Sequence, residues 1–208
     1  MKRPQSTIDF SRYALAAAAL GTVSAVKTAD ADFIPPYALN PPPNATYSGA
    51  AANGVFGNWT SSLTFVPSSD SLVTNQPTSV SLNIQNFTFP ATTDNFDLVT
   101  TAAGSGTVSF DWSLSGTGFG PLTFGYLVNG SFTQLGQVTS TGQSSSSSFA
   151  VSAGDTFGFR LIANYGGSGG VTISNFAAPI PEPSITMLAV TGAVGLLALR
   201  AVRRRRVS

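Results

Sequence analysis

Aspartates are almost the only side chains in the middle of this 208-residue chain that could do acid–base or metal chemistry, because the sequence has no histidine and no cysteine. Asp94 and Asp97 lie close together around Asn95 and offer the hard oxygen atoms that bind Ca²⁺. The stretch has no EF-hand spacing, so a solvated acidic turn is the competing interpretation. Without thiolate or imidazole ligands we expect no other metal site and no cofactor.

Catalysis by the common nucleophile schemes is excluded for residues 32–178, which contain no His, Cys, Lys or Glu. Serine–histidine, cysteine–histidine and serine–lysine pairs each need one of those residues. A glycosidase needs only two opposed carboxyl groups, for which Asp94, Asp97 and Asp111 are candidates. Because aspartate is typical of turns and solvated faces, we predict a protein without enzymatic activity.

Exposed aromatic rings are the other candidate binding groups, since each combines a flat apolar face with a polar rim. Tyr165, in a glycine-rich stretch, is the best candidate for ligand contact, and Trp59 is the second. Trp112 shares its face of an alternating stretch with Phe110 and Leu114, so we predict that it belongs to the core.

Charge is concentrated at the two ends of the chain. Residues 32–178 carry Arg160 as their only cation against six aspartates, a net charge of −5. By alternation along their strands Asp111 and Arg160 both point outward, where they could pair across neighbouring strands. Binding of phosphate groups needs clustered Lys and Arg, so we expect no nucleic-acid partner.

Alternation of apolar and polar residues predicts strands through the middle of the chain, at 79–85, 107–114, 122–128, 131–135, 156–161 and 171–173. Asn129-Gly130 predicts a hairpin turn between two of them. The serines at 144–148 indicate a solvated edge strand or a loop, and the Pro-rich residues 32–53 indicate an extended arm or edge segment. The pattern predicts an all-β antiparallel sandwich over 54–178.

The first 31 residues have the three parts of a secretory signal peptide. A basic start precedes the apolar residues 13–26, and Ala29-Asp30-Ala31 predicts cleavage before Asp32. Ser24-Ala25 gives an earlier alternative. Fourteen apolar residues are too few to span a bilayer comfortably, so we predict export through the secretion machinery.

Pro181-Glu182-Pro183 begins the other unusual end, residues 179–208. An uncharged apolar stretch follows, and residues 185–202 would form a helix about 27 Å long, which just spans a hydrocarbon core. A basic cluster then holds this end in the cytoplasm; it consists of Arg203, Arg204, Arg205 and Arg206. The sequence therefore predicts a single C-terminal transmembrane helix in the inner membrane.

The motif, the apolar helix and the arginine cluster together resemble the PEP-CTERM sorting signal of Gram-negative bacteria that make exopolysaccharide. The resemblance implies an exosortase-like transpeptidase as partner, which cleaves near the motif and delivers the protein to the cell surface or matrix. Residues 106–178 also resemble the domain that such proteins often carry, on the stretches 106–112, 126–130, 153–160 and 172–176. That likeness implies a jelly-roll-like sandwich without an assigned activity.

Two functions follow as expectations. The first is a structural or adhesive role in the envelope or biofilm, after transient anchoring in the inner membrane. The alternative is a carbohydrate-binding module that recognises the exopolysaccharide.

Overall fold

The computed structural model describes residues 33, 35–39, 45–64, 70–75, 78–86 and 93–181. The expected signal peptide, Glu182 and Pro183 of the sorting motif, the helix at 185–202 and the arginine cluster lie outside these residues. Within the described part of the chain, no helix is long and apolar enough to cross a membrane.

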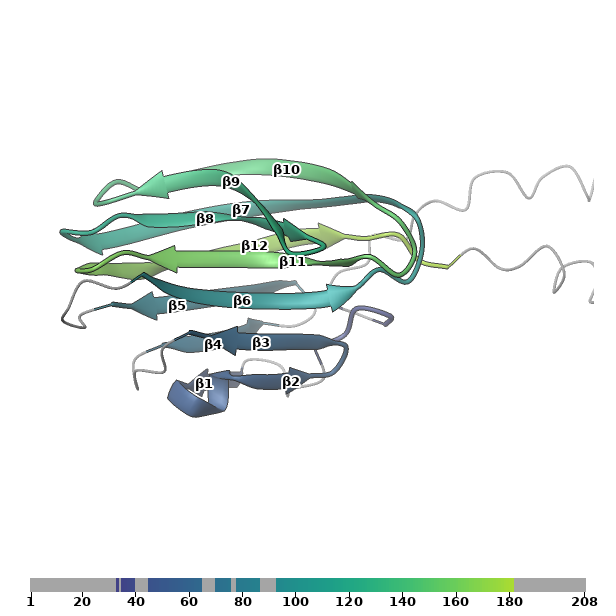
Figure 1. Cartoon of the computed structure of the whole chain (residues 1–208), viewed down its shortest axis with the longest axis horizontal. Helices are drawn as coiled ribbons and strands as arrows, with labels where there is room; N and C mark the ends of the chain where they lie inside the picture. Colours follow the sequence, from purple (N-terminus) through teal and green to yellow (C-terminus); the bar gives the residue numbers. More distant parts are fainter. Residues whose placement is uncertain are drawn as a thin grey trace, which may run out of the picture.

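Two six-stranded sheets face each other in the described chain (Figure 1). Sheet A contains, in spatial order, β1 (Ala45–Ser48), β4 (Ser71–Asn75), β5 (Ser79–Gln85), β12 (Gly167–Ala177), β7 (Gly106–Gly118) and β10 (Gln143–Val151). Sheet B contains, in spatial order, β2 (Gly54–Phe56), β3 (Trp59–Leu63), β6 (Asp94–Thr101), β11 (Thr156–Ala163), β8 (Leu122–Val128) and β9 (Ser131–Val138). A short 3₁₀ turn, Gly49–Ala52, follows β1.

The eight strands from β5 to β12 form a jelly roll. The order β5-β12-β7-β10 faces the order β6-β11-β8-β9, so the chain crosses repeatedly between the sheets, and the pairs within each sheet are antiparallel. The pairs β1–β4 and β2–β3 extend the two sheets along the same edge. The antiparallel sandwich expected from the alternating pattern is therefore confirmed.

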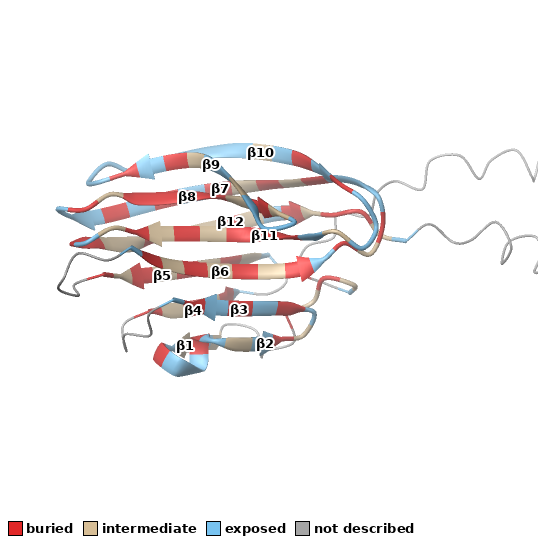
Figure 2. Ribbon diagram, in the orientation of Figure 1, coloured by how far each residue is buried: buried red, intermediate tan, exposed pale blue. Residues whose placement is uncertain are grey.

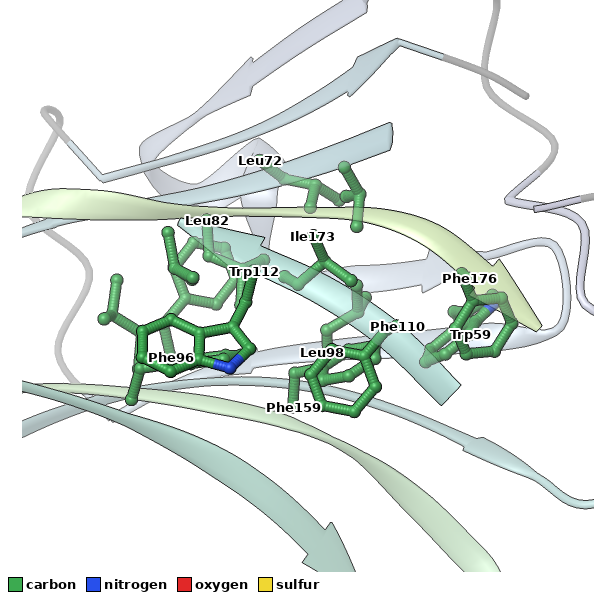
Figure 3. Packing of buried hydrophobic residues seen from close by; sticks show 14 of the residues in the cluster. Trp59, Leu72, Leu82, Phe96, Leu98, Phe110, Trp112, Phe159, Ile173 and Phe176 are labelled. Carbon is green, nitrogen blue, oxygen red and sulfur yellow. The ribbon is translucent and has the colours of Figure 1, made fainter. Parts of the chain in front are cut away.

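Side chains alternate between the space inside the sandwich and the solvent along most strands (Figure 2). On β7 the inward positions are Val108, Phe110, Trp112 and Leu114, all nearly inaccessible to water. Trp112 is 5% exposed, which confirms its predicted place in the core. Figure 3 shows it between the sheets with the other large inward residues. Burial of this apolar surface is the main force that holds the sheets together.

The Pro-rich segment is part of the folded domain. Phe33, Tyr37 and Leu39 are completely or almost completely buried, and β1 forms the edge of sheet A. The Tyr37 hydroxyl donates to the carbonyl of Pro179 and accepts a hydrogen bond from the Ala103 amide at 3.0 Å. The sandwich thus begins before residue 54, and the hydrogen bond from Tyr37 to Pro179 joins its N-terminal segment to its C-terminal end.

The hairpin between β8 and β9 turns at Asn129 and Gly130, as predicted. Both residues have positive φ, 50° and 80°, which a two-residue type I′ turn requires and which Asn and Gly adopt most easily. The serine-rich stretch is also a strand, β10, at the edge of sheet A.

Candidate ligand-binding site

Two turns meet at one end of the sandwich, on the left in Figure 1. Residues 118–121 connect β7 to β8, and residues 164–166 connect β11 to β12; we call them the turn pair, and this end the loop end. The Phe119 amide donates to the Gly166 carbonyl at 3.1 Å, and the Asn164 amide donates to the Pro121 carbonyl at 3.1 Å. These two backbone bonds tie the turns together.

Glycine lets the two turns approach this closely. Gly118 has a φ of 111°, and a Cβ there would lie 2.1 Å from the Gly166 carbonyl oxygen. A Cβ on Gly120 would lie 2.2 Å from the Tyr165 carbonyl oxygen. Only a residue without a side chain fits at these positions, so the turn pair is closely packed through its backbone.

Two aromatic side chains extend from the turn pair toward solvent. Phe119 is fully exposed and Tyr165 is 46% exposed; among the described residues, Val55 on β2 is the other large hydrophobic side chain that is exposed. A free-standing Phe on a tight turn buries nothing in the fold, so its apolar face is available to a ligand. The exposure of Tyr165 agrees with its expected role, whereas Phe119 was missed.

The end of β5 supports the turn that carries Tyr165. Asn86 donates from its amide to the Gly167 carbonyl at 2.9 Å and accepts from the Gly166 amide at 2.8 Å. Its side-chain Nδ2 donates to the Ala163 carbonyl at 3.0 Å. Thr93, just before β6, donates from Oγ1 to the Asn164 Oδ1 at 3.2 Å. The turn is therefore fixed from three sides before any ligand arrives.

Two buried carboxyl groups lie behind the turn pair. Asp70 leads into β4 and is 0% exposed, and Asp94 opens β6 and is 2% exposed. Burial raises the pKa of Asp70 to about 7; the hydrogen bond from the Gln85 amide opposes that rise, and the charge of Asp94 adds to it. Neither the burial of these groups nor their proximity was foreseen.

The expected acidic turn around Asp94 and Asp97 is a strand, and the structure does not bring the two carboxylates together. Because side chains alternate along β6, Asp94 points inward and Asp97 outward. Asp97 accepts from Nε and from Nη2 of Arg160, both at 2.6 Å. This fork-shaped pair raises the pKa of Arg160 and leaves Asp97 occupied.

The expected pair between Asp111 and Arg160 is also wrong, because β7 and β11 belong to opposite sheets. Asp111 accepts hydrogen bonds from the Ser146 hydroxyl and, at 2.6 Å, from Asn175 Nδ2. These bonds, the one from Ser146 first, lower the pKa of Asp111. The three carboxyl groups considered for a glycosidase are therefore not brought together: Asp94 and Asp97 lie on opposite faces of β6, and Asp111 lies on the other sheet.

Trp59 cannot contact a ligand, which corrects the expectation from the sequence. Its side chain is 0% exposed and lies among Phe33, Phe157 and Phe176, and its Nε1 donates to the Tyr37 carbonyl at 2.8 Å. Figure 3 shows it beside Phe176, inside the sandwich.

Among the described residues, no group of three or more Asp, Glu, His or Cys side chains is placed to hold a metal ion.

Neither a protein-family model nor a curated protein matches the sequence. Among solved structures, the chain is similar to a family 29 carbohydrate-binding module, with 11% identity over 64% of this chain and 86% of that one and a TM-score of 0.35. It is also similar to TmCBM61 in complex with β-1,4-galactotriose, with 12% identity, 66% and 99% coverage and a TM-score of 0.36. A third similar structure is a CBM4 module, with 9% identity over 65% of this chain and 95% of that one and a TM-score of 0.36. At such values these likenesses carry no conclusion about what the chain binds.

Proposed function

We propose that this chain is an exported, non-catalytic protein whose sandwich binds a polysaccharide through the turn pair. The observation that carries the proposal is the exposure of Phe119 and Tyr165 on adjoining turns that backbone hydrogen bonds hold in place. Aromatic faces suit the apolar faces of sugar rings. Turns that are already fixed lose little conformational entropy when a ligand binds.

The charges at the turn pair favour a neutral ligand. Residues 118–121 and 164–166 contain no charged side chain. The single arginine of residues 32–178 is bound to Asp97 on the outer face of sheet B. A strongly anionic polymer would find no cation at this end, so the proposed ligand is a polysaccharide without charged sugars.

The proposal includes the cellular route that the sequence predicts. The chain would pass the secretion machinery, stay briefly in the inner membrane, and reach the cell surface or matrix after an exosortase-like enzyme acts at Pro181-Glu182-Pro183. The end of the fold supports this route. Pro179 is held by the Tyr37 hydroxyl and Ile180 packs against the core, whereas Pro181 is exposed. The first residue of the motif is therefore accessible and directly follows the packed end of the sandwich.

A structural or adhesive role is the second candidate, favoured by the outer face of sheet A. One row across this sheet consists of Thr46, Val73, Ser81, Thr172, Ser113 and Ser144. The hydroxyls of Ser81 and Thr172 are hydrogen-bonded at 2.8 Å. Five of these six residues carry hydroxyl groups and none is charged, so the row suits contact with a hydrated matrix.

A glycan array that includes the host's own exopolysaccharide distinguishes the two candidates, with the full-length chain in mild detergent. We expect binding that Phe119→Ala or Tyr165→Ala weakens about tenfold, which corresponds to roughly 1.4 kcal/mol. Val55→Ala is the matched control, because it removes an exposed apolar side chain on β2. If no glycan binds, or if all variants bind alike, the turn pair is not the site and the structural role takes its place.

Processing is tested separately by intact-mass measurement in a host that carries the sorting enzyme. The mature protein should begin at Asp32 (or at Val26) and should lack the helix and the terminal arginines. Replacing the three motif residues by alanine should leave a full-length, membrane-bound form. Normal processing of that variant would contradict the proposed role of the motif.

A further inference from the structure

Asp70 has a carboxylate oxygen that none of the described residues binds. Its side chain is 0% exposed. Its Oδ1 accepts a hydrogen bond from the Gln85 amide at 2.8 Å, while its Oδ2 has no hydrogen-bond partner in the part of the chain that the structure describes. A buried carboxylate without partners for its oxygens destabilises the folded state, because it has lost its hydration. The fold therefore leaves an unfilled acceptor in its interior at the loop end.

A second carboxylate faces the same place from the opposite sheet. The link from Asp70 runs through two neighbouring residues: the Gln85 amide binds Asp70, and the next residue, Asn86, donates from Nδ2 to the Ala163 carbonyl. Ala163 in turn lies opposite Asp94 in the β6–β11 ladder. The charge of Asp94 is also close enough to act on the carboxyl group of Asp70. Two buried aspartates, one before β4 and one at the start of β6, are thus neighbours inside the loop end.

Among the described residues, none supplies a positive charge for this pair. Arg160 is the only Lys or Arg in residues 32–178, and it is bound to Asp97 on the outer face of sheet B. Two ionised carboxylates close together in a buried site repel each other and need a counter-charge. A small hard cation supplies that charge and also takes the unused oxygen as a ligand.

We propose that Asp70 and Asp94 bind one divalent cation, Ca²⁺, between the two sheets at the loop end. Ca²⁺ prefers oxygen ligands and accepts irregular sets of them, so carbonyl oxygens and water can complete the shell around two carboxylates. The site replaces the pair Asp94 and Asp97 suggested by the sequence, and it departs from the expectation that the chain has no other metal site. It does not depend on the turn pair binding a glycan.

A cation here would also stabilise the turn that carries Tyr165. Thr93 is adjacent to Asp94 and donates to Asn164, the residue before Tyr165. Asn86, which holds the backbone of Gly166, is adjacent to Gln85, the residue that binds Asp70. Loss of the ion should therefore loosen the loop end first, while the far end of the sandwich keeps its packing.

The test uses the full-length chain in mild detergent, stripped with EDTA and then titrated with CaCl₂ in a calorimeter. We expect one site per chain. At Ca²⁺ about 100-fold above the dissociation constant, the melting temperature should rise by about 5 °C or more, since a ligand that binds only the folded state stabilises it by mass action.

Asp70→Asn and Asp94→Asn should abolish both the calorimetric signal and the Ca²⁺-dependent rise in melting temperature. Asp97→Asn and Asp111→Asn are the matched controls and should keep them, because those carboxylates lie on outer faces.

If a variant at position 70 or 94 fails to fold, the proposal is tested by titrating the unmodified chain and Asp97→Asn in parallel, and both should bind Ca²⁺. The proposal is overturned if the stripped chain shows no calorimetric signal and melts alike in EDTA and in millimolar Ca²⁺, because a proton then fills the site. It is overturned equally if Asp97→Asn abolishes binding and Asp70→Asn does not.

Discussion

The two ends of the sandwich use the same kind of residue in opposite ways. At the far end, β11 begins and β12 ends (on the right in Figure 1). A cluster of aromatic rings almost without exposure packs there, made of Phe33, Tyr37, Trp59, Phe157 and Phe176. At the loop end, Phe119 and Tyr165 face solvent on two turns that glycines bring together. The rings at the far end are buried and contribute stability, whereas Phe119 at the loop end buries nothing and Tyr165 is about half exposed.

The difference shows that topology, more than residue type, decides what an aromatic side chain does here. A ring at an inward position of a strand, or on the N-terminal segment, is covered by the facing sheet. A ring on a turn that connects two strands lies beyond the ends of both sheets, so no sheet covers it. The four predictions below test this contrast from the largest expected effect to the smallest.

Trp59→Ala should lower the free energy of unfolding by about 3–5 kcal/mol, as expected for truncation of a buried aromatic. Chemical denaturation measures this effect. Glycan binding by the folded fraction should not change, because the turn pair lies at the other end. A loss of affinity with unchanged stability would reverse the assignment of the two ends.

Gly120→Ala should destabilise the protein by about 1–3 kcal/mol, because the new methyl group would lie 2.2 Å from a backbone carbonyl oxygen. It should also weaken glycan binding, since the turns must separate to admit it. Gly130→Ala is a useful comparison: its methyl group would have no atom within 4 Å, although the φ of 80° at this position adds local strain. That variant should bind glycan normally. Equal binding by both variants would show that the turn pair need not be rigid.

Tyr37 should make the far end sensitive to alkali. Burial raises the pKa of Tyr37, an effect that the hydrogen bond with the Ala103 amide partly opposes. The folded state therefore holds this proton more tightly than the unfolded state does. The corresponding stability is complete below pH 10, the ordinary pKa of tyrosine, and is lost as the pH rises through the higher folded value. Melting curves above pH 10 should show this loss.

Tyr37→Phe should remove most of that alkaline dependence, and at neutral pH it should cost about 1–3 kcal/mol through the groups left without a partner. If Tyr37→Phe still loses stability above pH 10 as the unmodified protein does, another tyrosine is responsible for the pH dependence.

Phe119→Ala should change the free energy of unfolding by less than about 0.5 kcal/mol, the usual range for exposed positions. Thermal melting measures the stability of the variant, and the glycan-binding assay on the same sample measures its affinity. A clear loss of stability would mean that the ring packs against the domain and is not presented to a ligand.

Alternation of side chains predicted the strands whose inward positions are all apolar. β5, β7, β8 and β11 belong to this group, and the Asn-Gly turn predicted the hairpin between β8 and β9. Other strands were not predicted, because a polar residue at an inward position breaks the alternation of apolar and polar side chains. In β3 this residue is Ser61, whose hydroxyl donates to the Ala52 carbonyl at 2.6 Å; in β6 it is Asp94.

The candidate site was only partly predictable for a similar reason. Tyr165 was recognisable from its glycine-rich surroundings. Phe119 lies between two glycines and two residues before Pro121, so it carried the same signal but was missed. The proximity of Asp70 and Asp94 carried no local signal. It depends on which strands of the two sheets end side by side, and only the fold supplies that information.

The single strand β12 connects the two ends of the molecule and has a mechanical consequence. It starts at the turn pair, lies between β5 and β7 in the interior of sheet A, and leads directly to Pro181. If a polymer holds one end and a membrane or surface holds the other, tension runs along β12. Its ladders to β5 and β7 have hydrogen bonds perpendicular to the strands, so they would be loaded in shear, many at once. The domain should therefore resist pulling between these two points far better than pulling that peels an edge strand such as β10 from the sheet.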